Sequence, residues 1–329
     1  MNAPDKTQAD GIAVAARIVP PPGTVSPQAR DHLSHPVPIP ARPALHPDDV
    51  EGWKKAADEL EASYMPAVQL WLGQADAGVE VTTISGVTAY RAEPHRLSSW
   101  AHGKLHLHIH GGGWAFWGGE ACRGFAAMEA HRLGCRTISV DYRRPPDHRF
   151  PAALDDCVLV YRRLVETHDA NDIVISGISA GANLAAATTL RVRDERLPTP
   201  GAVVLLSPGT DAALRGDTLV AHDGLDHVIR RETAAECWAV YAGGHDPTDP
   251  YLSPVYGDFS KGFPPTFIQT GTRDLFLSDS VRLHRALRRA GASAELHVWE
   301  AMPHGGFGGA PEDAEVQSEV RAFLAGIWR

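Results

Sequence analysis

A serine between two glycines is the residue of this chain whose setting is best suited to chemistry. Ser179 lies in the sequence GISAG (177–181), between an apolar run that predicts a strand, 172–176, and a stretch that predicts a helix, 182–193. A G-x-S-x-G sequence between a strand and a helix predicts a sharp turn that strains the serine backbone and exposes its hydroxyl. The flanking glycines let the strand and the helix approach each other. This setting favours Ser179 as a nucleophile over a simple glycine-rich turn.

A run of glycines could stabilise the negative charge that such a nucleophile creates on its substrate. The sequence HGGGW (110–114) follows an apolar, strand-like segment. An oxyanion needs two or three preorganised N–H donors, and glycine lets main-chain N–H groups approach a ligand closely. We therefore expect the N–H groups of Gly112, Gly113 and Ala180 to form an oxyanion hole. The bulky aromatic residues that follow the run favour a loop anchored by burial over a flexible one.

The acid and the base that would activate the serine follow it in the sequence. In proteins with this turn the triad has the chain order Ser, acid, His. Asp274 comes after a predicted strand, 266–270, and His304 after another, 295–299. Both lie at the carboxyl ends of strands, where the active sites of open α/β sheets collect. We expect Asp274 to orient His304, and His304 to accept the serine proton. The alternative acid is Asp279, a helical turn later.

Three histidines alternate along the strand before the glycine run and raise the alternative of a metal site. His106, His108 and His110 would share one face of that strand, and three imidazoles could bind zinc. No HExxH sequence accompanies them, and neither GK[ST] nor GxGxxG follows the glycines. We therefore expect no metal ion, no phosphate-binding loop and no cofactor.

A mostly parallel sheet is the framework that would bring these residues together. Short apolar strands are separated by helical windows, which is typical of βαβ units whose helices cover both faces of a sheet. A turn at Ser85 and Gly86 follows the first strand. The predicted strands are 79–84, 105–110, 136–141, 172–176, 202–206, 266–270 and 295–299, and the predicted helices between them are 125–133, 154–166 and 182–193.

Two segments outside this framework interrupt the alternation of strands and helices. Residues 1–45 are rich in proline and lack periodicity, which predicts an extended arm. A helix is expected within 46–75, because acidic residues open it and apolar positions recur at three- and four-residue steps. Residues 76–329 are expected to form the catalytic domain, in which about 209–254 is too long for a simple connection. We expect this insertion and the 46–75 helix to form a lid over one edge of the sheet.

The composition excludes several classes of protein. The net charge is −9, with no basic cluster, which argues against nucleic-acid binding. The chain is 43% hydrophobic and 22% charged, which is typical of a folded globular protein. We find no apolar run of about 18 residues that would predict a membrane span, and no signal-peptide pattern. The 4 cysteines form no CxxC pair, so we expect reduced thiols and a cytoplasmic location.

Three spaced sequences together resemble the hormone-sensitive lipase family of α/β-hydrolases. They are HGGGW (110–114), DYRRPPD (141–147) followed by FPAALDD (150–156), and the serine turn at 177–181. The resemblance extends from about residue 50 to the C-terminus. It implies the α/β-hydrolase fold, with a mostly parallel eight-stranded sheet covered by helices on both faces. It also implies a helical cap, built from N-terminal helices and an insertion after the sixth strand.

The chain departs from the common pattern of that family at three places. The serine turn of the family usually reads GDSAGG, whereas Ile178 and Ala182 replace its Asp and its last Gly here. The family sequence DYRLAPE is DYRRPPD at 141–147, and HGF is HGGF at 304–307. None of these changes removes a catalytic group. They suggest a side branch of the family, to which the family's substrate preference transfers poorly.

The resemblance implies a serine carboxylesterase that works through an acyl-enzyme intermediate. Trp114, Trp117, Trp238 and Tyr241 are expected to line an apolar pocket for neutral esters with small to medium acyl or alcohol groups. The same machinery could hydrolyse a lactone or an amide, and a non-catalytic small-molecule receptor is the alternative of another class. The presence of all three triad residues favours the enzyme. Dimers formed through edge strands are common in the family, so a homodimer is one expectation for the assembly.

Overall fold

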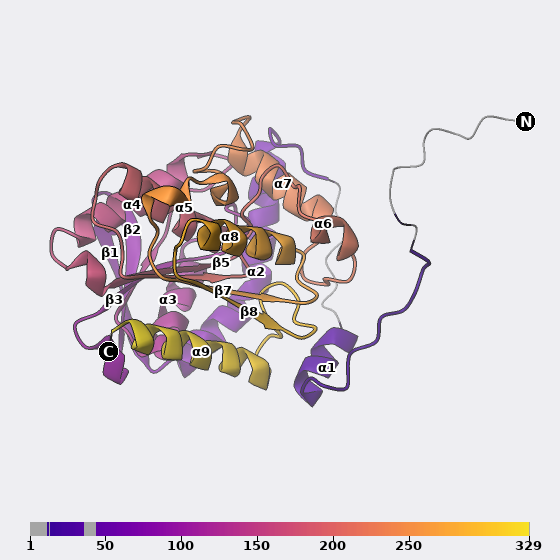
Figure 1. The fold of residues 1–329 in the computed structure, drawn as a ribbon, viewed down its shortest axis with the longest axis horizontal. Coiled ribbons are helices and arrows are strands. Elements are labelled where there is room, and N and C mark those ends of the chain that lie inside the picture. Colours follow the sequence, from indigo (N-terminus) through magenta and orange to yellow (C-terminus); the bar gives the residue numbers. More distant parts are fainter. Residues whose placement is uncertain (1–11, 13, 36–43, 329) are drawn as a thin grey trace, which may run out of the picture.

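A sheet of eight strands forms the centre of the molecule (Figure 1). The computed structural model describes residue 12 and residues 14–35 and 44–328. The strand order is β1-β2-β4-β3-β5-β6-β7-β8, in which β2 runs antiparallel to both neighbours and the other pairs are parallel. The strands are β1 (Ala77–Ile84), β2 (Val87–Pro94), β3 (Leu105–Ile109), β4 (Thr137–Val140), β5 (Ile173–Ile178), β6 (Ala202–Leu206), β7 (Thr266–Gly271) and β8 (Ala294–Trp299).

Helices cover both faces of this sheet, so the predicted fold class is confirmed. On one face α3 contacts β1, β2 and β4, and α9 contacts β6 and β7. On the other face α4, α5 and α8 pack over the strands (Figure 1). Their bounds are α3 (Glu120–Leu133), α4 (Ala152–Leu164), α5 (Ala180–Asp194), α8 (Leu277–Arg289) and α9 (Pro311–Ile327). β3 and β5 are buried on both sides; β5 (IVISGI) is a largely apolar run, whereas in β3 (LHLHI) two buried histidines alternate with apolar residues.

The strand that the sequence analysis missed is β2. It follows β1 after a two-residue turn, in which Ser85 has φ 52° and Gly86 has φ 84°. β1 and β2 then pair in antiparallel register along their whole length. Two of the buried residues of β2 are Ala89 and Ala92, and alanine contributes little to a strand-like hydrophobic pattern. The hairpin adds the antiparallel edge to an otherwise parallel sheet.

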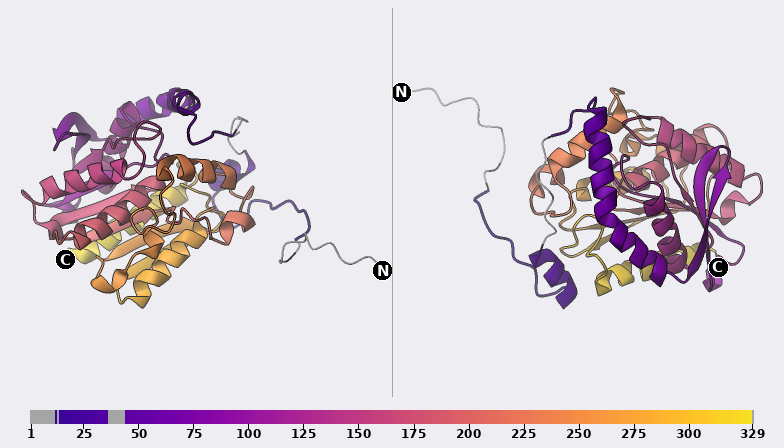
Figure 2. Two further views of the ribbon diagram at one scale, coloured as in Figure 1. Left: turned by 90° about the horizontal axis from the view of Figure 1, so that it is seen from above. Right: turned by 180° about the vertical axis from the view of Figure 1, so that it is seen from behind.

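The two segments predicted to lie outside the sheet are in contact with each other. α2 (Val50–Gln74) is capped by the carboxylate of Asp49 and packs along α3 (Figure 2). Its Trp53 is buried against Phe116. The insertion between β6 and β7 carries α6 (Thr218–Ala221) and α7 (Arg231–Ala242), and Glu236 of α7 accepts the N–H of Leu45. This last hydrogen bond joins the segment just before the N-terminal helix to the insertion.

Part of the proline-rich arm is helical, which corrects the prediction of an extended arm over residues 1–45. Ser26 caps α1 (Pro27–Ser34) by accepting the N–H of Ala29. The N–H and the hydroxyl of Ser26 also donate to the carboxylate of Glu312, at the start of α9. The prediction missed this helix because 8 residues give too few turns for a hydrophobic period. Residues 1–11, 13 and 36–43 of the predicted arm lie outside the described residues.

Short helical turns complete several connections, and the longest helix of the described chain is α2, with 25 residues. None of the described helices is long and apolar enough to cross a membrane. The 3-10 turns are η1 (Ser99–Ala101), η2 (Ala170–Asp172), η3 (Pro254–Tyr256) and η4 (Phe259–Lys261).

Candidate active site

A strained turn at Ser179 joins the end of β5 to the start of α5. Ser179 has φ 57° and ψ −122°, a conformation that is unfavourable for a residue with a Cβ. A Cβ on Gly177 would lie 2.3 Å from the main chain of Gly181, and one on Gly181 would lie 2.0 Å from the main-chain oxygen of Ile109. Glycine is therefore required on both sides of the serine. The turn holds Ser179 at the N-terminus of α5, where the helix dipole favours negative charge.

The structure brings the three residues of the predicted triad together. His304 Nε2 lies 2.9 Å from Ser179 Oγ, and His304 Nδ1 lies 3.2 Å from Asp274 Oδ1. Because an ionised carboxylate can only accept, Nδ1 carries the proton and Nε2 is free to accept from the serine hydroxyl. The carboxylate of Asp274 is held by two further donors, the hydroxyl of Thr270 at 2.9 Å and the N–H of Phe276 at 2.9 Å.

Burial and charge oppose each other at the acid and the base. Burial alone would raise the pKa of Asp274, but the charge of His304 and three hydrogen bonds hold it below its ordinary value. Burial alone would lower the pKa of His304, but the charge of Asp274, their hydrogen bond and the charge of Asp226 raise it. The pair therefore favours an ionised carboxylate beside an imidazole that readily takes up a proton.

The alternative acid, Asp279, belongs to a different group of contacts. Its Oδ2 accepts the N–H groups of Thr210 at 2.6 Å and Asp211 at 3.1 Å. Its Oδ1 is buried without a partner among the described residues. Burial raises the pKa of Asp279 to about 7, and the charge of Asp211 contributes in the same direction. Asp274, and not Asp279, is therefore the carboxylate that contacts the ring of His304.

The glycine loop follows β3 and is fixed by its own main chain. Gly112 has φ 102° and Gly113 has φ 55°, and a Cβ on Gly112 would lie 2.7 Å from the main-chain oxygen of Phe116. The oxygen of Gly112 accepts the N–H groups of Ala115 and Phe116, which closes a tight turn. Within the described chain, the N–H groups of Gly112, Gly113 and Ala180 donate to no other protein group. They are available to a ligand.

The aromatic residues predicted to line a pocket pack mainly against one another. Trp114 stacks on Tyr241 with ring centroids 4.7 Å apart and lies 4.0 Å from Trp238, so the glycine loop is anchored to α7. These three side chains are buried. Trp117 stacks instead on Tyr64 of α2 at 4.9 Å. The indole N–H groups of all three tryptophans and the hydroxyl of Tyr241 lack partners among the described residues. Contact with substrate stays a prediction for these four residues.

The three alternating histidines have different partners. His106 is hydrogen-bonded to the hydroxyls of Thr137 at 3.0 Å and Ser176 at 2.6 Å, and His108 to the hydroxyl of Ser139 at 2.8 Å. Burial lowers the pKa of both imidazoles, so they are neutral. These hydroxyl partners occupy ring nitrogens that a metal ion would need.

His110 belongs to another group, which is the one set of potential metal ligands found in the described chain. His110, Cys122 and Asp141 each offer one ligand atom within 4.8 Å of the others. Burial lowers the pKa of His110 to about 3 and raises the pKa of the Cys122 thiol. A metal ion bound there would have to displace the thiol proton.

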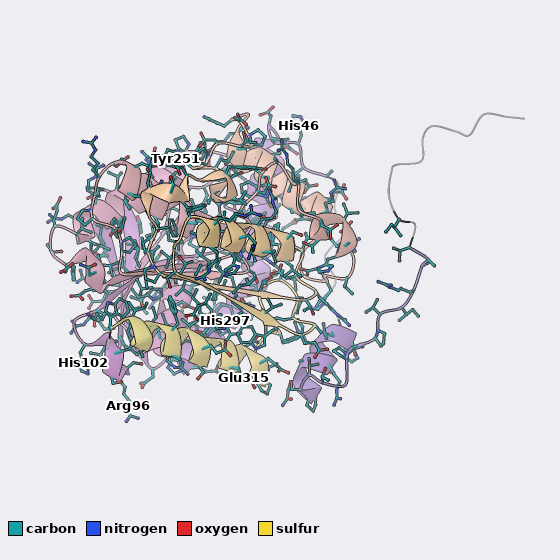
Figure 3. All side chains as sticks on the ribbon, viewed as in Figure 1. His46, Arg96, His102, Tyr251, His297 and Glu315 are labelled. Carbon is teal, nitrogen blue, oxygen red and sulfur yellow. The ribbon has the colours of Figure 1, made fainter. Side chains whose placement is uncertain are left out.

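A groove of about 430 Å³ lies between β8 and α9. His297 lies in it, near the surface of the molecule (Figure 3). Its ring stacks on Phe267, and its nitrogens are hydrogen-bonded to Glu319 and Glu295. The lining residues are Ser293, Glu295, His297, Glu319, Ala322, Phe323, Gly326 and Ile327. The groove contains none of the triad residues.

One buried carboxylate beside the triad was missed by the sequence analysis. Asp226, in the insertion, accepts the N–H groups of Leu275 and His304. The sequence around it, DGLDHV (223–228), has no hydrophobic period and matches no motif. The sequence shows Asp226 only as an aspartate within a long insertion, and Asp217 fits the same description.

The fold and the arrangement at the serine turn define an α/β hydrolase. Residues 106–307 match the family described as the alpha/beta hydrolase fold, and the chain belongs to it. The chain is 31% identical to an acetyl-hydrolase of Streptomyces hygroscopicus over 226 residues, which are 68% of this chain and 74% of the relative. It is 32% identical to an esterase of Acinetobacter venetianus, over 60% of this chain and 66% of that relative. It is 28% identical to an ethyl acetate hydrolase of Pseudomonas putida, over 75% of this chain and 82% of that relative.

Solved structures similar to this chain show to which type of α/β hydrolase it belongs. The crystal structure of an esterase, E25, matches with a TM-score of 0.89 and 33% identity over 98% of this chain and 100% of that chain. A hormone-sensitive lipase from a metagenome library matches with a TM-score of 0.73 and 30% identity over 86% of this chain and 99% of that chain. This chain is a carboxylic ester hydrolase of the hormone-sensitive lipase type.

The raised pKa of Asp279 makes a prediction about stability. The ordinary value is 3.8 and the folded value about 7, so the folded protein binds more protons than the unfolded chain between these values. Stability should therefore fall as pH rises through this range. Asp279→Asn keeps an oxygen for the two N–H donors and removes the charge. We expect the free energy of unfolding of this variant, measured with urea, to vary less between about pH 5 and pH 8 than that of the wild type.

The control for this measurement is Glu315→Gln, because Glu315 is exposed on α9 (Figure 3). The control should keep the pH dependence of the wild type. An equal pH dependence in Asp279→Asn and the wild type would show that Asp279 does not titrate in this range.

Proposed function

We propose that this esterase uses Ser179 as nucleophile, His304 as general base and Asp274 as the residue that orients the base. The observation that carries the proposal is the continuous chain of hydrogen bonds from Asp274 through His304 to Ser179, with distances of 3.2 and 2.9 Å. The strained turn supports the same assignment, as do the N–H groups of Gly112, Gly113 and Ala180, which have no partner among the described residues.

The proposed reaction forms and then hydrolyses an acyl-enzyme. His304 Nε2 accepts the hydroxyl proton as Ser179 Oγ attacks the ester carbonyl carbon, and Asp274 stabilises the imidazolium. The carbonyl oxygen becomes an oxyanion, which the N–H groups of Gly112, Gly113 and Ala180 hold. The imidazolium gives its proton to the leaving alcohol, and the C–O bond to that alcohol breaks. Water activated by the same imidazole then releases the acid and regenerates the serine.

We propose that the segments outside the sheet form the cap over this site. In this division residues 1–45 are the N-terminal arm, 46–75 the cap helix and 76–329 the catalytic domain, with the cap insertion at about 209–254. The contact between α7 and the segment before α2 supports a cap made of both parts. The stacking of Trp114 on Tyr241 supports an apolar wall between the glycine loop and α7.

Neutral esters with small to medium groups are the proposed substrates. The relatives named acetyl-hydrolase and ethyl acetate hydrolase support short acyl groups. A lactone is an ester within a ring and needs the same nucleophile and oxyanion hole, and an amide needs the same machinery with a poorer leaving group. A non-catalytic receptor is disfavoured, because the serine, the imidazole and the carboxylate are all present and hydrogen-bonded.

Removal of the nucleophile tests the proposal. Ser179→Ala should lower kcat on p-nitrophenyl acetate by about 10⁴–10⁶, because the covalent step is lost. Ser260→Ala, a change of an exposed serine in η4, should leave kcat unchanged. Substantial activity in folded Ser179→Ala would refute the assignment.

The protonation state of His304 predicts the acid limb of the pH profile. A protonated imidazole cannot accept the serine proton, so kcat/KM should fall as the pH drops through the pKa of His304. Since that pKa is raised, the midpoint should lie above 6.5. Initial rates measured across the pH range check this, and a profile that is flat down to about pH 4 would contradict a histidine base.

The range of substrates is tested by a panel of p-nitrophenyl esters of rising acyl length, with lactones and an anilide beside them. We expect the highest kcat/KM for short to medium acyl chains, because an apolar pocket of limited size excludes longer ones. A clear preference for long-chain triacylglycerols would contradict this pocket. A preference for lactones would identify the alternative substrate class.

A further inference from the structure

A buried carboxylate of the insertion accepts hydrogen bonds from both loops that carry the acid and the base. Asp226 lies between α6 and α7 and has no exposed surface. Its Oδ2 accepts the N–H of Leu275 at 2.8 Å and the N–H of His304 at 3.1 Å. Leu275 directly follows Asp274 in the sequence. One oxygen atom therefore ties the loop of the acid to the main chain of the base.

The other oxygen of this carboxylate fixes the direction in which the first one points. Asp226 Oδ1 accepts the N–H groups of Val228 at 2.9 Å and Ile229 at 3.3 Å, within its own segment. Hydrogen bonds from N–H groups to an ionised carboxylate are stronger than those between neutral groups. The four bonds together make this turn of the insertion a rigid attachment point.

The same segment holds the loop of the acid at two further places. The hydroxyl of Thr218, at the start of α6, donates to the main-chain oxygen of Leu275 at 2.9 Å. The ring of His222, at the end of α6, donates from Nδ1 to the main-chain oxygen of Asp274 at 2.9 Å. The position of the acid therefore depends on the insertion as well as on β7.

Asp226 also brings a second negative charge to the base. Burial raises the pKa of Asp226, and a positive charge on His304 opposes this effect. At His304, the charge of Asp226 acts in the same direction as that of Asp274 and raises the pKa of the imidazole. Loss of the charge of Asp226 would therefore make His304 harder to protonate.

Other ionisable groups near this segment differ in their contacts. His227 has a pKa that burial lowers to about 4, and the charges of His32 and Arg273 lower it further. The ring of His32, from α1, lies 4.8 Å from that of His227. Asp223, three residues before Asp226, is paired with Arg230 near the surface at 3.0 Å. Asp223 therefore provides a control carboxylate on the same segment.

We infer that Asp226 is a positioning residue, which sets the separation between the loop of Asp274 and His304 and makes the insertion part of the catalytic geometry. This inference rests on the proposed roles of Asp274 and His304. It gives the insertion a task beyond that of covering the substrate.

The test is Asp226→Asn, which keeps the size of the side chain but removes its charge and one of its two acceptor oxygens. We expect kcat on p-nitrophenyl acetate to fall about 10²-fold, because misalignment of reacting groups has an effect of this order. KM should change less than about threefold, because Asp226 has no exposed surface for a substrate to contact. The acid limb of the kcat/KM profile should move to lower pH by about 0.5–1 unit. If Asp226 only stabilised the fold, Asp226→Asn would reduce the amount of folded enzyme and leave the acid limb of the kcat/KM profile at the same pH.

Two matched variants complete the experiment. Asp223→Asn should keep the kcat and the acid limb of the wild type. Asp226→Glu keeps the charge but misplaces it, so kcat should fall while the limb stays in place. The inference would be overturned if Asp226→Asn, shown to be folded by thermal melting, kept the kcat of the wild type and the acid limb of its pH profile. If that variant does not fold, wild-type kcat in Asp226→Glu would overturn it.

Ser179→Ala separates this inference from the proposed function on which it rests. Activity in folded Ser179→Ala would refute both. An inactive Ser179→Ala together with an unaffected Asp226→Asn would refute the positioning role alone.

Discussion

The close approach of α5 to β3 is the constraint on which the rest of the site depends. A Cβ on Gly181 would lie 2.0 Å from the main-chain oxygen of Ile109, so this approach is possible only for glycine. It forces the turn before it into a strained conformation and sets the serine at the start of the helix. β3 also leads into the glycine loop, and β3 and β5 are adjacent parallel strands. A Cβ on Gly111, at the start of that loop, would lie 3.5 Å from the Cβ of Ser179, so the serine turn and the glycine loop are neighbours.

Three buried aspartates, Asp274, Asp279 and Asp226, have different pKa shifts because their surroundings differ. Asp274 is buried, yet the positive charge of His304 and several donors keep its pKa below the ordinary value. Asp279 lacks such a positive partner in its hydrogen bonds, one of its oxygens has no partner, and burial raises its pKa to about 7. Asp226 lies between these cases, with four N–H donors and a raised pKa. Only Asp274 both contacts the imidazole and is held in its ionised form.

Much of the parallel part of the fold was predictable from the sequence because buried strands such as β5 and β6 consist of largely apolar runs. The hairpin strand β2 was missed, since Ala89 and Ala92 give a weak pattern. The helix α1 was missed because it is short and is stabilised by a distant partner, Glu312. A hydrogen bond between residues 286 positions apart leaves no local pattern in the sequence.

The residues of the candidate site were likewise predictable only in part. Ser179, Asp274 and His304 could be selected because each follows a strand whose carboxyl end lies at the same edge of the sheet. Asp226 could not be selected, since its partners lie 49 and 78 residues away and its segment has no regular pattern. The packing of Trp114 on Tyr241 and Trp238 was equally invisible, because ring contacts between a loop and a helix depend on tertiary structure.

The central claim is that one serine hydroxyl forms the covalent bond to the acyl group. The most direct measurement is mass spectrometry of peptides after reaction with a p-nitrophenyl alkylphosphonate, whose phosphorus imitates the tetrahedral intermediate. We expect one p-nitrophenol released per chain, complete loss of esterase activity and a single phosphonyl group on the peptide that contains Ser179. Modification of a different residue, or an inactivated enzyme whose Ser179 peptide is unmodified, would contradict the account.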